Sequence, residues 1–144
     1  GKIIIDYAHT PDAYEKLFST IANFCSEEAT IYTVFGCGGN RDPRKRSEMA
    51  AIAEKYADFV IVTTDNPRTE SVEIINSNII MGFKGNNYEI ILDRKDAIYR
   101  MMAQMDEQSI LLVLGKGREN YQEIGTKKIP YNDKETIESY ISEG

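Results

Sequence analysis

The sequence predicts an α/β domain, an open Rossmann-like three-layer sandwich with a mostly parallel sheet. Short apolar runs alternate along the chain with segments whose apolar residues recur at helical spacing. The runs are nearly continuous rather than alternating, as expected of parallel strands that helices cover on both faces. A chain of 144 residues is long enough for one such domain. It is too short for an α/β barrel, which excludes that fold.

Five apolar runs predict the parallel strands: residues 3–5, 30–35, 58–64, 88–92 and 109–115. Residues 127–132 predict one more short strand. Because little chain separates that strand from the one before it, we expect it to run antiparallel at the edge of the sheet. The sheet would then hold about six strands.

Helical spacing of apolar residues fills the segments between these strands. The first helix carries Tyr14, Leu17, Phe18 and Ile21 on one face, and the preceding Thr10-Pro11-Asp12 is a typical helix start. The predicted helices cover residues 12–24, about 49–56, 71–82, 94–105 and 133–142. We find no repeat, linker or low-complexity segment, so residues 1–144 are expected to form a single domain.

Composition narrows the classes of partner. The formal net charge of −6 argues against nucleic acid or an anionic membrane as the main partner. No apolar run approaches the roughly 18 residues of a membrane span, and no signal peptide opens the chain. Cys25 and Cys37 lack metal-ligand spacing, which predicts free thiols in a reducing cytoplasm and no metal site.

The unusual residues follow the carboxyl ends of the predicted strands. Ligands of open parallel sheets bind at that edge, so the loops there predict a site for a polar ligand. The opposite loops, such as "NFCSEEA" and "GFKGNN", are typical solvated turns. The five loops at the carboxyl edge are "DYAHTPD", "GCGGNRDPRKR", "DNPRTE", "DRKD" and "GKGREN".

Arg68 stands out among these loops. Asn66 and Pro67 would make a turn without it. An arginine at the end of a strand offers a planar fork for a carboxylate. The plainer alternative is a surface arginine paired with Glu70 or Glu73.

The glycine-rich loops have two interpretations each. Gly36 to Gly39 could let backbone N–H groups approach an anion, or form a flexible loop beside a solvated basic run. The same glycines are an incomplete dinucleotide fingerprint, which leaves a nicotinamide-dependent oxidoreductase as an alternative function. "GKGREN" lacks the spacing of a phosphate-binding P-loop, and is either a plain turn or a loop whose Glu119 meets an ammonium group.

His9, the only histidine, could cap a helix at the surface or face a ligand. A nucleophilic pair of His9 with Cys37 is conceivable, but no further residue supports it. We therefore assign no residue of this chain a certain catalytic role.

Taken together, six stretches resemble the C-terminal domain of the Mur ligases, and most of all the MurE type. The resemblance covers nearly the whole chain, and the combination is specific although each motif alone is not. The stretches are "DYAHTPD", "VFGCGGNRD", "KRSEMA", "TTDNPRTE", "LGKGRENYQ" and "YNDKE".

This resemblance implies a three-domain, ATP-dependent amide ligase of peptidoglycan synthesis, and hence of cell-wall biogenesis and division. The first domain would bind the UDP end of the substrate, and the central domain would hold ATP and Mg²⁺. ATP would phosphorylate the D-glutamate carboxyl of UDP-MurNAc-L-Ala-D-Glu, and the amine of meso-diaminopimelate would attack the acyl phosphate. This chain would be the third, amino-acid-binding domain, closing on the central ATPase domain and inactive alone.

The resemblance also implies roles for individual residues. Asp6 and His9 match positions that approach ATP. The positions that bind the amino-acid substrate are matched by Arg41, Asn66, Arg68, Gly115 and Glu119.

Two departures from the family pattern bear on the choice of amino acid. Arg118 replaces the usual histidine of "GKGHE", and Lys134 replaces the arginine of "DRE". L-lysine is therefore the alternative substrate within the family. A stand-alone amino-acid-binding module is the alternative outside it.

Overall fold

The computed structural model describes residues 1–144, and its main sheet has five parallel strands in the order β1-β5-β2-β3-β4. Every neighbouring pair in this sheet is parallel. The strands are β1 (Lys2–Asp6), β2 (Thr30–Phe35), β3 (Phe59–Val62), β4 (Tyr88–Ile90) and β5 (Ser109–Leu114).

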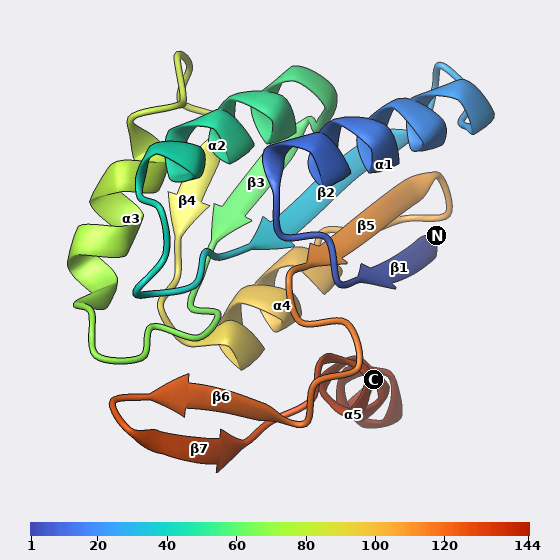
Figure 1. The fold of residues 1–144 in the computed structure, drawn as a ribbon. Coiled ribbons are helices and arrows are strands. Elements are labelled where there is room, and N and C mark those ends of the chain that lie inside the picture. Colours follow the sequence, from blue (N-terminus) through green and yellow to red (C-terminus); the bar gives the residue numbers. More distant parts are fainter.

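Helices cover both faces of this sheet, which confirms the predicted three-layer α/β fold. Figure 1 shows α1 and α2 along one face, with α3 beside α2, and α4 on the opposite face. The helix α5 packs against α4. The helices are α1 (Pro11–Phe24), α2 (Arg44–Tyr56), α3 (Val72–Ile80), α4 (Arg94–Met102) and α5 (Asp133–Glu143).

The continuous apolar runs are explained by two cores, one on each face. Phe35 of β2 and Leu112 of β5 join the core that α1, α2 and α3 cover. Their neighbours Val34 and Val113 point the other way, into the core that α4 and α5 cover. Since successive strand residues alternate between faces, burial on both faces requires apolar residues at every position.

The predicted antiparallel strand exists but does not join the edge of the main sheet. Strand β7 (Lys127–Pro130) pairs with β6 (Tyr121–Ile124) in a separate two-stranded hairpin. The sequence prediction missed β6, because "YQEI" contains no apolar run. Gly125, at φ +64°, opens the two-residue turn between the strands, a conformation that glycine adopts without strain.

A buried ion pair fixes the carboxyl ends of β3 and β5. Both side chains are fully buried, and Arg94 Nε and Nη2 donate to the two carboxylate oxygens of Asp133 at 2.8 and 2.9 Å. The guanidinium also donates to the carbonyls of Thr64 at 3.3 Å and Leu114 at 3.1 Å. This one arginine therefore joins α4, α5 and two strand ends that lead into loops.

None of the helices combines the length and the apolar character that crossing a membrane would need.

We expect Asp133→Ala to lower the free energy of unfolding by about 3–5 kcal/mol, because it leaves the Arg94 charge buried without a partner. Chemical denaturation would measure the loss. Glu138→Ala, on the exposed side of α5, is the control and should change stability by less than about 0.5 kcal/mol. A loss below about 1 kcal/mol in Asp133→Ala would contradict this account of the pair.

Candidate functional site

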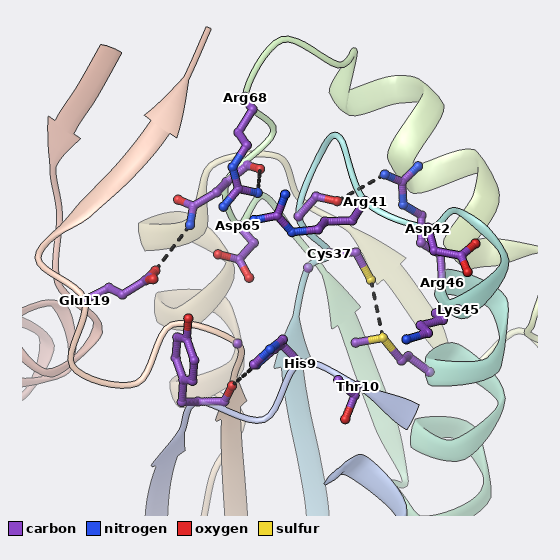
Figure 2. Close-up of a pocket in the computed structure, with 16 residues that line it drawn as sticks. His9, Thr10, Cys37, Arg41, Asp42, Lys45, Arg46, Asp65, Arg68 and Glu119 are labelled. Carbon is purple, nitrogen blue, oxygen red and sulfur yellow. Dashed lines mark hydrogen bonds between the residues drawn. The ribbon is translucent and has the colours of Figure 1, made fainter. Parts of the chain in front are cut away.

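A pocket of about 320 Å³ lies at the carboxyl edge of the main sheet. Loops that follow β1, β2, β3 and β5 form its walls, and the first turn of α2 forms one side (Figure 2). Of the residues predicted to bind a ligand, all but Asp6 line it. The lining residues are Tyr7, His9, Thr10, Gly36, Cys37, Gly38, Arg41, Asp42, Lys45, Arg46, Met49, Asp65, Asn66, Arg68, Gly115 and Glu119.

A buried ammonium group organises one wall of this pocket. Lys116 is fully buried, and its Nζ donates to Asp65 Oδ1 at 3.2 Å, Asn66 Oδ1 at 2.8 Å and Glu119 Oε1 at 3.1 Å. Three acceptors satisfy the three donors of an ammonium group. Lys116 therefore joins the loop after β3 to the loop after β5. Sequence reasoning considered this lysine only as part of a loop that is not a P-loop, because lysine is almost never fully buried unless it is paired.

Gly115 lets this network close. Its φ of +112° is outside the range that other residues favour, and a Cβ there would lie 2.6 Å from Asp65 Oδ2. Gly115 is thus required for close packing, and it lies in the pocket wall.

Asn66 has little free hydrogen-bonding capacity. Its Oδ1 accepts from Lys116 Nζ and from the backbone N–H of Glu123, at 2.8 and 2.9 Å. Its Nδ2 donates to Glu119 Oε1 at 3.2 Å. Since the amide is oriented from both ends, Asn66 presents a fixed surface to the pocket.

Glu119 keeps one carboxylate oxygen available. Oε1 accepts from both Lys116 and Asn66, whereas Oε2 has no partner within the chain. The side chain is 18% exposed and points into the pocket from the loop after β5 (Figure 2). The free oxygen can accept a hydrogen bond from a cationic ligand group.

Arg68 occupies a constrained position in the pocket wall. Its φ is +55°, which is uncommon for a residue with a Cβ. Its Nε lies 2.7 Å from Glu123 Oε2 of β6, and its Nη1 donates to the carbonyl of Gly39 at 3.1 Å. The alternative pairing with Glu70 or Glu73 is wrong, because the partner is Glu123.

Glu70 is instead paired with the buried Arg46. The two guanidinium nitrogens Nη1 and Nη2 donate to both oxygens of Glu70 at 2.7 and 2.8 Å. Nη2 also donates to the carbonyl of Gly38 at 3.1 Å, so α2 holds the loop after β2 against the segment after β3. These hydrogen bonds from Arg46 lower the pKa of Glu70 to about 2.

The glycine-rich loop after β2 packs against the protein itself. A Cβ on Gly36 would lie 2.2 Å from the carbonyl oxygen of Thr63, and one on Gly39 would lie 1.8 Å from that of Pro67. The backbone N–H of Gly39 already donates to the carbonyl of Asn66 at 2.8 Å. The glycines therefore allow two loops to touch, which removes the main support for a dinucleotide site.

Cys37 and His9 line the pocket but do not form a catalytic pair. Burial raises the pKa of the Cys37 thiol to about 12, and its Sγ lies 4.0 Å from Met49 Sδ. His9 Nδ1 lies 2.8 Å from the carbonyl oxygen of Tyr7. Because only a thiolate is a good nucleophile, Cys37 is inert in this state.

The pocket presents charges of both signs to a ligand. Arg41, Arg68, Asp65 and Glu119 all line it (Figure 2). Such a wall suits a zwitterion, since it offers donors to a carboxylate and acceptors to an ammonium group. No cluster of three or more His, Cys, Asp or Glu side chains is placed to hold a metal ion.

Fold and pocket together define a class, an open parallel α/β domain that binds a small charged ligand at its carboxyl edge. Comparison with known proteins is more specific. The family described as "Mur ligase, glutamate ligase domain" matches residues 1–117. The chain belongs to this family.

The similar proteins are longer than this chain. A UDP-N-acetylmuramoyl-L-alanyl-D-glutamate–2,6-diaminopimelate ligase of Rickettsia rickettsii is 47% identical over 139 residues, which are 96% of this chain and 29% of the relative. The ligase of the same name from Clostridioides difficile is 44% identical over 142 residues, 97% of this chain and 29% of the relative. The chain thus spans less than a third of these relatives.

Solved structures agree with the fold. A structure of a UDP-N-acetylmuramoyl-L-alanyl-D-glutamate–2,6-diaminopimelate ligase matches with a TM-score of 0.90 and 38% identity, covering 98% of this chain and 29% of that one. The Escherichia coli protein FolC in complex with ADP matches with a TM-score of 0.61 and 20% identity, covering 78% of this chain and 25% of that one. The second match shows the shared fold alone.

The ion pair of Glu70 makes a pH-dependent prediction. A carboxylate whose pKa is lower in the folded chain than in the unfolded chain stabilises the fold above the unfolded value, near 4.5, and this stabilisation is lost as the pH falls toward 2. We expect Glu70→Gln to lower the free energy of unfolding at pH 7 by about 1.5–3 kcal/mol. The difference from wild type should shrink to near zero at pH 2. Denaturation at several pH values measures it, and a difference that does not vary with pH would refute the assignment.

Proposed function

We propose that this chain is the amino-acid-binding domain of a longer, ATP-dependent ligase that adds meso-diaminopimelate to UDP-MurNAc-L-Ala-D-Glu. The other domains would bind the UDP end of that substrate and hold ATP with Mg²⁺. As part of such a ligase, the domain would work in the cytoplasm in peptidoglycan synthesis. The relatives named as diaminopimelate ligases support this assignment through identities of 44–47% over nearly the whole chain.

The observation that carries the choice of substrate is that Arg68 and Glu119 line the same pocket. Diaminopimelate has a second zwitterionic end that L-lysine lacks. The guanidinium of Arg68 would bind its carboxylate, and Glu119 Oε2 would accept from its ammonium group. L-lysine would leave the arginine without its ligand partner, which favours discrimination between the two amino acids.

The two departures from the family pattern lie outside the pocket. Arg118 and Lys134 are both exposed, and neither lines it. Their side chains therefore do not argue for L-lysine, which stays the alternative substrate. The neighbour of Lys134, Asp133, has its own structural role in the buried pair with Arg94.

This chain would position groups rather than transfer phosphate. ATP would supply the phosphoryl group that activates the D-glutamate carboxyl, and the central domain would hold it. Arg41, Asn66 and Gly115 would complete the binding of the amino acid, whose free amine must point toward the activated carboxyl. Asp6 ends β1 and His9 lies in the loop after it, where a domain that closes on ATP could bring them near it. Asp6 Oδ1 accepts from the backbone N–H of Ala8 at 2.8 Å, which fixes that loop.

The test is an assay of the full-length protein. We expect phosphate release from ATP to require both UDP-MurNAc-L-Ala-D-Glu and meso-diaminopimelate, with a tripeptide product detected by mass spectrometry. Efficient turnover with L-lysine in place of diaminopimelate would support the lysine-adding alternative. Binding of NADH without any turnover would support an oxidoreductase instead.

Arg68→Ala should lower kcat/KM for meso-diaminopimelate by about 10- to 100-fold, the effect of losing one or two charge-assisted hydrogen bonds. Activity with L-lysine should change by less than about threefold, since lysine has no carboxylate at that end. Arg100→Ala is a matched control, because Arg100 pairs with Glu89 away from the pocket. Equal losses with both amino acids would contradict the role of Arg68.

A further inference from the structure

We propose that Glu123 of the β6–β7 hairpin is a positioning residue that sets the preference for a diacidic amino acid. Glu123 does not line the pocket, so it would act through Arg68 rather than touch the substrate. This inference rests on the proposed function, because it concerns the same binding site. It goes beyond that function by assigning a role to the hairpin.

The hairpin holds the backbone of Arg68 on both sides. The N–H of Arg68 donates to the carbonyl of Glu123 at 2.8 Å, and its carbonyl accepts from the N–H of Gly125 at 2.7 Å. Arg68 and Ile124 thereby form an isolated parallel bridge. These two hydrogen bonds offset the strain of a φ of +55° at Arg68, a conformation that a free loop would rarely adopt.

Glu123 also holds the side chain of Arg68. Its Oε2 lies 2.7 Å from Arg68 Nε, and both side chains are only about a quarter exposed, at 26% and 23%. Nη1 is occupied by the carbonyls of Gly39 at 3.1 Å and Asn66 at 3.4 Å. The other terminal nitrogen, Nη2, has no partner within the chain. Glu123 thus turns the guanidinium so that its unoccupied donors remain for the pocket.

Glu123 orients a second predicted ligand-binding residue as well. Its backbone N–H donates to Asn66 Oδ1 at 2.9 Å, and this bond helps to direct the Asn66 amide toward Glu119. Its other carboxylate oxygen is 4.0 Å from Lys128 Nζ across the hairpin, so a second cation offsets part of its charge. The backbone contact with Asn66 would survive the substitution of Glu123 by alanine or glutamine, whereas the carboxylate contact with Arg68 would not.

The charge of Glu123 has two opposing effects on an anionic ligand. The Glu123 carboxylate weakly repels the ligand carboxylate. It also fixes the Arg68 guanidinium group that would bind that ligand carboxylate. A freely rotating arginine must lose conformational entropy on binding, so preorganisation favours affinity. Glu123 lies only 2.7 Å from Arg68 Nε, and the ligand would bind on the far side of the guanidinium. We therefore expect the gain from orienting Arg68 to outweigh the repulsion between Glu123 and the ligand carboxylate.

The test uses the full-length ligase and three variants. We expect Glu123→Ala to raise the KM for meso-diaminopimelate about tenfold, with kcat within twofold of wild type and with L-lysine turnover unchanged. Glu123→Gln keeps an oxygen beside Nε, and should return the KM to within about threefold of wild type. Glu89→Ala removes the carboxylate of another Glu–Arg pair, with Arg100, and should leave both kinetic constants unchanged.

The possible failures are distinguishable. A wild-type enzyme that does not use diaminopimelate would overturn the proposed function and this inference together. If the wild type uses it and Glu123→Ala behaves like wild type, only the inference fails. A similar loss with both amino acids, together with a lowered melting temperature that glutamine does not restore, would reduce Glu123 to a structural contact and also overturn the inference.

Discussion

The pocket depends on one buried charge, the ammonium group of Lys116. It is the only contact that brings Asp65, Asn66 and Glu119 to a common point. Burying a charge is costly unless it is paired and fully hydrogen-bonded, and here three oxygens supply both conditions. Lys116 also stabilises the two carboxylates, since Asp65 and Glu119 would otherwise lie near each other without its positive charge between them. A wall that can receive a cationic ligand group is thus assembled around an internal cation.

Three arginines make the same kind of contact at different depths in the domain: an ion pair with one carboxylate and hydrogen bonds to backbone carbonyls. Arg94 is fully buried and fixes the ends of β3 and β5. Arg46 holds the loops after β2 and β3 together, and Arg68 lies at the surface of the pocket. Each guanidinium combines one carboxylate with at least one backbone carbonyl. The planar group with five donors allows this, and a lysine could not replace it. The three arginines differ in their unoccupied guanidinium nitrogens. Among them, only Arg68 lines the pocket and also has a terminal nitrogen without a partner in the chain.

The sequence predicted the sheet, its parallel strands and the edge where the pocket lies, because burial on both faces leaves a strong apolar pattern. It did not predict β6 or the hairpin, since a short, half-buried strand such as Tyr121–Ile124 has no such pattern. The sequence singled out Arg68, which lines the pocket, but its partner Glu123 lies 55 positions away. Asp65 and Lys116 were missed because pairing across loops leaves no periodic signal in a sequence.

The strand order has a consequence for how the chain must fold. β5 lies between β1 and β2, so an interior strand of the sheet is the last of its five strands along the chain. β1 has no neighbouring strand, and β2 has only β3, until residues 109–114 have been inserted between them. Contacts of such high sequence separation are slow to form, because long loops must close first. We therefore expect the pocket to form late in folding. A chain that stopped after β4 would contain the loop after β3 but would lack Lys116 and Glu119, which hold the Asn66 side chain.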